Sequence, residues 1–584
     1  MSLDRPRNTE DVTMKWGSDV VAEMLRRLDL DFIALNPGAS FRGLHDSIVN
    51  YLGNRNPQIL LTLHEESAVS IAHGYAKVRG KPMGVVVHSN VGLMNASMTI
   101  FNAWCGRVPI MILGATGPVD ADRRRPWIDW IHTAQDQGAL VRDYTKWDDQ
   151  PASVKAAVES LLRAYQLTCT APSGPVYICL DAALQQDELK EDLALPDPAR
   201  FRPAAPQQAA PAVLEEAAEL LMKAEDPLML IGRVSRRRED WDRRIRLAEA
   251  LGARVVSDVK VGSVFPTRHP LHEAVLPIAV PQQSLDSLRR ADVILSLDWV
   301  DLGGFIKQVW GSEEVGATVI HCSVDCYIHR GWSKDYQALP PVDVPILAEP
   351  DVMVSQLLDL VRTGGAKTPP GNPSGVEEGR GREVGEARAG SGNPNHGIDL
   401  YEMARALEEA KGERKVCLIR LPLKWPPEAC DFQDPMDYLG GDGGGAVGAG
   451  PGMCVGAALA LRGTDRYPVA ILGDGDFLMG VTALWTAARY RIPLFIVIAN
   501  NRKFKNTESH QVRVATHRSR PLENKWIGQH IDDPPVDLAA MARAQGWEAE
   551  GPVENAAGLR DALSRGFKAL EDGGCYLVDV LVAR

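Results

Sequence analysis

The sequence predicts an α/β protein built from three doubly wound parallel-sheet domains. Continuous apolar runs of strand length recur along the chain, which is typical of strands buried on both faces of a parallel sheet. Helix-patterned segments alternate with these runs, as in βαβ units. A chain of 584 residues is also too long for a single hydrophobic core. The expected divisions are an N-terminal domain, a middle Rossmann-like domain, a flexible linker and a C-terminal domain, at residues 1–192, 212–362, 363–397 and 398–584.

Strand and helix patterns recur in all three predicted domains. Strands are expected at residues 82–89, 108–115, 227–232, 253–259, 291–298, 317–325, 467–474, 493–501 and 575–583. Helices are expected between strands at residues 90–107, 241–252 and 480–492. A strand, a crossover helix and a parallel strand in this order predict a doubly wound sheet in each domain.

Two segments read as linkers between these domains. Residues 363–397 are dense in glycine, proline and charge and nearly free of large apolar side chains. Such a segment cannot bury enough surface to offset the entropy lost on ordering. A weaker linker pattern, rich in proline and alanine, covers residues 193–211.

Composition excludes several classes of protein. The net charge of −12 argues against a nucleic-acid-binding surface, which would be basic. The nine cysteines form no CxxC pair, as expected of reduced thiols inside the cell. The first residues lack a signal-peptide core, and no run of about 18 apolar residues predicts a membrane span. We therefore expect a soluble, cytoplasmic protein with no membrane and no nucleic-acid partner.

A phosphate and metal site is predicted where two strands of the third domain end. The first strand runs into Gly473-Asp474-Gly475, followed by Asp476 and a helix. Glycines let the backbone approach a ligand, a helix start favours phosphate, and carboxylates suit Mg²⁺. The next strand ends at Asn501, and neighbouring parallel strands end at the same edge of a sheet. Asp474 and Asn501 are therefore expected to converge on one ion.

This segment resembles the thiamine-diphosphate (ThDP)-dependent enzymes of the acetolactate synthase and benzoylformate decarboxylase type. The shared residues are Gly473-Asp474-Gly475, the ALWTAA stretch at 483–488, and the paired asparagines that end at Asn501. The resemblance implies that Asp474, Asn501 and the backbone carbonyl of Lys503 bind Mg²⁺. It also implies that Gly473, Gly475 and Asp476 lie at the diphosphate.

A glycine-rich segment precedes this site, at residues 440–461. It contains a GxGxxG pattern, which would suggest a dinucleotide, but no clear strand precedes it and no acidic residue ends a following strand. The resemblance instead places Val447 where an apolar residue supports the bent cofactor. In the middle domain only Gly232 suggests a glycine-rich turn, so FAD is an option without support.

A proton-relay carboxylate is expected at the start of a helix in residues 61–90. The family pattern is His-Glu-x-x-Ala followed by Gly-Tyr-Ala, and His64-Glu65 with Gly74-Tyr75-Ala76 matches it. The resemblance implies that Glu65 exchanges a proton with the aminopyrimidine ring of ThDP, whereas Glu66 takes no part. From the residues alone, both glutamates also suit a helix start, where they offset the helix dipole.

Three further segments are expected on the substrate side. The resemblance places His88 in the position of a catalytic histidine, and His269 in that of a second one. It also places Asn36, Pro37 and Gly38 at the cofactor, with Ala39 where relatives of the decarboxylase type have serine, and Ser40 one residue later. In residues 502–510 the chain has Thr507 and His510 where apolar residues surround an aromatic substrate. This loop therefore predicts a polar or anionic 2-oxo substrate, bound through Lys505 or His510.

These observations predict ThDP- and Mg²⁺-dependent cleavage or formation of a carbon–carbon bond next to a 2-oxo group. A non-oxidative 2-oxo-acid decarboxylase is the first interpretation. Alternatives are an acetolactate-synthase-like carboligase and a diketone lyase or hydrolase, and, from other classes, a dinucleotide-binding oxidoreductase and an inactive ThDP-fold scaffold. Relatives form active sites between subunits, so the resemblance implies a homodimer or homotetramer.

Overall fold

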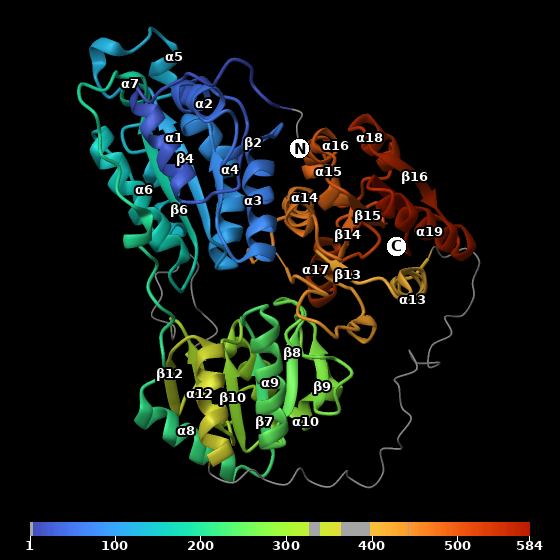
Figure 1. Ribbon diagram of the computed structural model, residues 1–584. Helices are drawn as coiled ribbons and strands as arrows, with labels where there is room; N and C mark the ends of the chain where they lie inside the picture. The colour runs from blue at the N-terminus through green and yellow to red at the C-terminus, as the bar shows by residue number, and fades with distance from the viewer. Residues whose placement is uncertain (1–3, 326–338, 364–397, 442, 584) are drawn as a thin grey trace. The chain divides into compact units, whose positions relative to one another are not determined.

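The computed structural model describes residues 4–325, 339–363, 398–441 and 443–583, and it contains three parallel sheets flanked by helices (Figure 1). The predicted α/β class with three parallel-sheet domains is confirmed. Thr363 ends a helix, and the rest of the predicted linker lies outside the described residues. No helix in the described part of the chain is both long and apolar enough to cross a bilayer.

The first sheet has the strand order β2-β1-β3-β4-β6-β5. Its strands are β1 Phe32–Leu35, β2 Gln58–Leu61, β3 Met83–Val86, β4 Ile110–Thr116, β5 Asp148–Asp149 and β6 Pro175–Asp181. Apolar side chains of α1 Gly17–Arg27 and α6 Val154–Cys169 form one core with the strands. Helices α3 Glu65–Arg79 and α4 Ser89–Cys105 contact β3 and β4. The predicted strand–helix–strand unit at 82–115 is therefore confirmed.

The middle sheet has the order β12-β11-β10-β7-β8-β9 and is covered on both faces. Its strands are β7 Pro227–Ile231, β8 Arg254–Asp258, β9 His272–Leu276, β10 Val293–Leu297, β11 Thr318–Ser323 and β12 Val344–Leu347. One core includes α8 Pro211–Lys223, α9 Arg238–Leu251 and α12 Pro350–Thr363. The core on the other face includes α10 Leu285–Arg289 and α11 Leu302–Trp310.

The third sheet has the order β13-β14-β15-β17-β16. Its strands are β13 Val416–Leu418, β14 Tyr467–Gly473, β15 Leu494–Asn500, β16 Glu548–Val553 and β17 Cys575–Leu581. Its helices are α13 Leu400–Lys411, α14 Ala449–Leu461, α15 Asp474–Gly480, α16 Ala483–Tyr490, α17 Lys505–His517, α18 Leu538–Ala544 and α19 Ala556–Glu571. The strands predicted at 467–474, 493–501 and 575–583 are all present.

By their contacts, the three sheets and their helices group into two compact units. The first and third sheets belong to one unit, where α3 packs directly on α14. Glycines make this close packing possible: a side chain on Gly74 would meet the Met453 carbonyl, and one on Gly456 would meet the Ile71 carbonyl. Residues 423–441, within the range predicted for the C-terminal domain, belong to the middle unit, where Phe432 pairs with Thr267.

Candidate active site

The predicted metal ligands meet at one edge of the third sheet. Gly473 of β14 is paired with Ala499 of β15, so Asp474 and Asn500 follow at the same edge. Asp474 is buried; its Oδ1 accepts a hydrogen bond from the Gly475 amide at 3.0 Å. Its Oδ2 is buried with no hydrogen-bond partner among the described residues. Burial raises the pKa of the Asp474 carboxyl, and the Gly475 amide opposes this rise. A buried carboxylate oxygen without a donor fits a bound cation.

The two asparagines at the end of β15 make different hydrogen bonds. Asn500 donates from Nδ2 to Oδ1 of Asp579 at 2.9 Å, and burial raises the pKa of that carboxyl to about 6. Asn501 instead accepts a hydrogen bond from the Lys503 amide at 3.0 Å, and the Lys503 carbonyl accepts one from the Lys505 amide at 3.0 Å. A carbonyl oxygen has two lone pairs, so both oxygens keep capacity for a metal ion. Asp474, Asn501 and Lys503 therefore fit the predicted Mg²⁺ site.

Asp476 holds the glycine-rich segment in place. Its Oδ1 accepts hydrogen bonds from the amides of Gly448 and Gly450 at 2.7 and 3.2 Å, and its Oδ2 pairs with Arg420 at 2.9 Å. Gly448 needs a backbone conformation that favours glycine, with φ of 106°. Val447, just before it, leaves 46% of its surface exposed, as expected of a side chain available to a ligand.

Glu65 and Glu66 begin α3 but face different neighbours. Glu65 is 6% exposed, and its Oε2 accepts a hydrogen bond from Nδ2 of Asn95 at 3.1 Å. Gly92 lies so close that a Cβ there would be 2.8 Å from Oε1 of Glu65. A Cβ on Gly448 would lie 3.1 Å from Oε1 of Glu66, and burial raises the pKa of Glu66. The two carboxylates therefore occupy different environments.

The substrate-side residues meet at the corresponding edge of the first sheet. Leu35 pairs with both Leu61 and Val86, so the chain leaves β1, β2 and β3 side by side just before Asn36, Glu65 and His88. Asn36 donates from Nδ2 to the Thr62 carbonyl at 3.0 Å, which ties the first turn to the second strand.

His88 rests against the turn that contains Pro37 and Gly38. A Cβ on Gly38 would lie 2.5 Å from Cγ of His88, so a side chain there would collide with the imidazole ring. Ser40 Oγ lies 2.8 Å from Nδ1 of His88 and also accepts a hydrogen bond from the Ser89 amide at 3.2 Å. Ser40, one residue after Ala39, thus places a hydroxyl against the imidazole of His88.

A second histidine, which sequence reasoning missed, stands beside His88. The ring of His132 lies edge-on to that of His88, with 4.7 Å between centroids. Burial lowers the pKa of His88; His132 and Arg125 lower it further, and Glu65 opposes them. His132 follows α5 Ile128–Ile131 in a segment without a recognisable motif, so no signal in the sequence identifies it.

His269 and the expected substrate loop have other surroundings. His269 belongs to the middle unit, with Nε2 3.3 Å from Oε1 of Glu249 and its ring edge-on to Phe265. Its catalytic role stays a prediction. The expected loop at 502–510 is largely helical, since α17 begins at Lys505. Nζ of Lys505 donates to the Ala583 carbonyl at 3.0 Å, and exposed His510 is hydrogen-bonded to Arg513 at 2.7 Å.

Comparison with known proteins gives consistent results across the chain. Three family models match: the N-terminal TPP binding domain, the central domain and the C-terminal TPP binding domain of thiamine pyrophosphate enzymes, at residues 15–140, 214–357 and 424–580. Benzoylformate decarboxylase from Pseudomonas aeruginosa is 26% identical over 92% of this chain and 94% of its own length. The acetolactate synthase large subunit of Corynebacterium glutamicum is 24% identical over 83% of this chain and 75% of its own length.

Solved structures share the fold. The ThDP-dependent 4-hydroxybenzoylformate decarboxylase of Rhodococcus jostii RHA1 superimposes with a TM-score of 0.74 at 22% identity, over 97% of this chain and 99% of that one. Benzoylformate decarboxylase from Polynucleobacter necessarius gives a TM-score of 0.76 at 19% identity, with the same shares of the two chains covered. The three domain matches, which together span most of the chain, show that it belongs to the family of thiamine pyrophosphate enzymes and is a ThDP-dependent enzyme.

Proposed function

We propose that this enzyme uses ThDP and Mg²⁺ to cleave or form a carbon–carbon bond next to a 2-oxo group. The first candidate activity is the non-oxidative decarboxylation of a 2-oxo acid. The observation that carries this proposal is the grouping of Glu65, His88 and the Asn36–Gly38 turn at one sheet edge. The similarity to benzoylformate decarboxylase over nearly the full length of both chains supports the same conclusion.

The residues at the third sheet fit the cofactor and its metal ion. Asp474, Asn501 and the Lys503 carbonyl would hold Mg²⁺, and the orphaned Oδ2 of Asp474 supports this. The Gly473–Gly475 turn at the start of α15 would take the diphosphate, with Val447 against the rings. ThDP, when bound, supplies a carbon nucleophile for the 2-oxo carbon and accepts the electrons of the broken bond.

The protein side chains would then carry and place protons. Buried Glu65, oriented by Asn95, would hold the proton exchanged with the cofactor. His88, with its ring fixed by Ser40 and its pKa lowered, is neutral near pH 7 and can both donate and accept a hydrogen bond. His88 would thereby orient the substrate and exchange a proton with it, and we keep His269 as a second candidate for this work.

A second candidate function is acetolactate-synthase-like carboligation. It is supported by the similarity to acetolactate synthase large subunits, one of which is 24% identical over 97% of this chain. Decarboxylation and carboligation share the same donor, and they differ in whether a proton or a carbonyl compound is the acceptor. Both activities therefore fit the residues around Glu65 and His88.

The test is a panel of 2-oxo acids assayed for CO₂ release, with and without aldehyde and 2-oxo acceptors. CO₂ release with an aldehyde product supports the decarboxylase, and a hydroxyketone product supports the carboligase. Purified enzyme that contains ThDP but releases no CO₂ from any 2-oxo acid would contradict both. We also propose a homodimer or homotetramer, as the family resemblance implies, which light scattering on the purified enzyme will test.

A further inference from the structure

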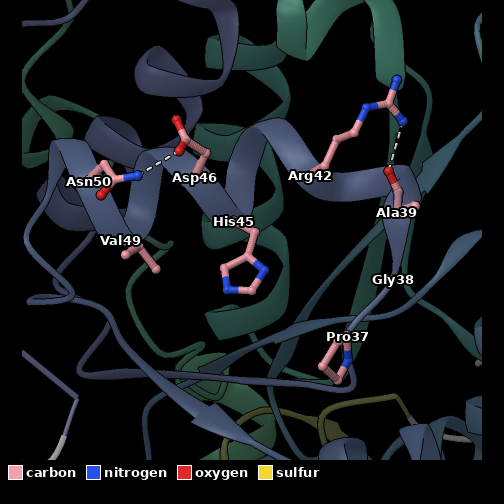
Figure 2. A pocket seen from close by; sticks show the side chains of 8 residues that line it. All are labelled: Pro37, Gly38, Ala39, Arg42, His45, Asp46, Val49 and Asn50. Carbon is pink, nitrogen blue, oxygen red and sulfur yellow. Dashed lines mark hydrogen bonds between the residues drawn. The ribbon is translucent and has the colours of Figure 1, made fainter. Parts of the chain in front are cut away.

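A groove lies beside the turn that packs against His88. It is open to solvent, has a volume of about 570 Å³ and is lined by Pro37, Gly38, Ala39, Arg42, His45, Asp46, Val49 and Asn50 (Figure 2). Pockets for small ligands commonly measure about 300–1,000 Å³, so this open groove suits one end of a small molecule. Its wall combines apolar surface from Pro37 and Val49 with the polar side chains of Arg42 and His45.

Arg42 places a cation at this groove, and the carboxylate that acts on it, Asp129, is already paired with Arg125 at 2.8 Å. Its side chain is half-buried, and its one hydrogen bond within the described residues runs from Nη1 to the Ala39 carbonyl at 2.9 Å. A guanidinium has five N–H donors, so most of its bonding capacity is unused. Burial lowers the pKa of Arg42, the positive charge of Arg125 adds to this effect, and the negative charge of Asp129 opposes it. A half-buried cation in this state favours an anionic ligand.

His45 adds a second polar group to the lining of the groove. Figure 2 shows its ring projecting from α2 Arg42–Asp46 toward Pro37, while the side chain of Arg42 extends from the same helix toward the Ala39 carbonyl. The ring makes no hydrogen bond within the described part of the chain, and burial lowers the pKa of His45. The acidic side chain of the groove, Asp46, is exposed and already accepts a hydrogen bond from Nδ2 of Asn50 at 2.6 Å. Arg42 and His45 therefore offer hydrogen-bond donors to the groove. Its one carboxylate, that of Asp46, is hydrogen-bonded to Asn50 and open to solvent.

The turn of residues 37–39 lies between this groove and His88. Pro37, Gly38 and Ala39 line the groove, while the Cβ direction of Gly38 points at the ring of His88. The groove and His88 therefore lie on either side of the same turn.

We infer that the groove binds a second anionic group of the substrate, so that the preferred substrates are 2-oxo acids with a carboxylate, sulfonate or phosphonate at the far end. Arg42 holds that group, His45 donates a further hydrogen bond, and Pro37 and Val49 contact the connecting methylenes. This inference rests on the proposed function, and it places the anion contact on Arg42 and His45 of α2 instead of on Lys505 and His510. Binding energy from such a remote group can also raise turnover when it orients the reacting carbon.

The test compares 2-oxoglutarate with 2-oxopentanoate, which has the same chain length and lacks the second carboxylate. We expect the wild-type enzyme to favour 2-oxoglutarate in kcat/KM. Arg42→Gln should lower kcat/KM for 2-oxoglutarate about 10- to 100-fold, the usual effect of losing a charged hydrogen-bond donor, and change that for 2-oxopentanoate less than about two-fold. For Arg42→Lys, kcat/KM for 2-oxoglutarate should lie between the values of the wild-type enzyme and Arg42→Gln. Arg55→Gln is the control, because it removes an exposed positive charge outside the groove.

Calorimetry with glutarate, which has no 2-oxo group, separates this inference from the proposed function. Glutarate binding that Arg42→Gln abolishes, in an enzyme that turns over no 2-oxo acid, would support the groove and contradict the proposed reaction. The inference would be overturned if 2-oxopentanoate and 2-oxoglutarate were turned over with equal kcat/KM, both by the wild-type enzyme and by Arg42→Gln. The proposed reaction would survive that result. Glutarate should compete with 2-oxoglutarate, and activation without competition would make the groove an effector site and overturn the inference. A change of oligomeric state in Arg42→Gln would assign the groove to a subunit contact, which also overturns the inference.

Discussion

Ser40 and His88 are joined through the hydroxyl and Nδ1 of the imidazole, 2.8 Å apart, although they lie on different strand–helix connections. This contact fixes the ring plane, so Ser40→Ala should lower kcat/KM about 2- to 10-fold, the range for a neutral hydrogen bond. ThDP affinity should not change. The double variant Ala39→Ser/Ser40→Ala puts the hydroxyl where relatives of the decarboxylase type are expected to carry it. Full activity in that double variant would contradict the specific role of Ser40.

His132 should set the acid limb of the pH profile through His88. Burial, and after it the charge of His132, lower the pKa of His88 below the ordinary value of 6.5, so the neutral ring persists as pH falls and is lost only below that value. In His132→Asn the pKa of His88 should rise, and the decline of kcat/KM should begin at higher pH. His517→Asn, an exposed change on α17, is the control. Identical acid limbs in wild type and His132→Asn would show that His132 does not act on His88.

The strand ends could be predicted from the sequence because register follows from buried apolar runs. Once the runs ending near Gly473 and Asn500 form neighbouring parallel strands, their carboxyl ends must meet, and the observed pairing of Gly473 with Ala499 confirms it. The same reasoning applies to His88, since Val86 pairs with Leu35. The apolar runs that form these strands, and the residues at which the strands end, are local properties that can be predicted directly from the sequence.

The remaining parts of the site depend on tertiary contacts that no local pattern specifies. His132 reaches His88 through an irregular segment whose path is set by packing, including the hydrogen bond from Nδ2 of Asn90 to the Ile131 carbonyl at 3.2 Å. Lys505 was predicted in a loop, but it begins a helix and its ammonium group donates to Ala583, far along the chain. Such long-range partners become visible only in the folded chain.

Glu65→Gln should abolish turnover and spare cofactor binding. The amide keeps the volume and can still accept a hydrogen bond from Asn95, but it cannot carry a proton, so kcat should fall about 10²–10⁴-fold. Glu66→Gln is the matched control, because its carboxylate faces Gly448, and it should be close to neutral. The reverse ranking of the two variants in steady-state kinetics would place the proton relay on Glu66.

Asp474→Ala should lose Mg²⁺-dependent retention of ThDP. Loss of a group that merely supports a metal ligand costs about 10–100-fold in metal affinity, so loss of an anionic ligand should cost more. Calorimetry with ThDP at fixed Mg²⁺ measures the change. Asp465→Ala removes an exposed carboxylate paired with Lys415 and should behave as wild type. Unchanged ThDP affinity in Asp474→Ala would remove Asp474 from the metal site.

Gly456→Ala should destabilise the contact between α3 and α14. The new methyl group would meet the Ile71 carbonyl on the facing helix, and neither backbone can move without separating the two helices. Overpacking of this kind costs about 1–3 kcal/mol. Alanine also gains about 0.5–1 kcal/mol over glycine within a helix, so the net loss of stability should be smaller than the cost of the clash alone.

Gly558→Ala on α19 is the matched control. Its methyl group would meet neighbours at 3.5 Å or more, so only the gain in helix stability remains. In urea unfolding followed by circular dichroism, the midpoint should fall for Gly456→Ala and stay or rise for Gly558→Ala. Equal midpoints would mean that the two helices pack less closely in solution than their facing glycines require.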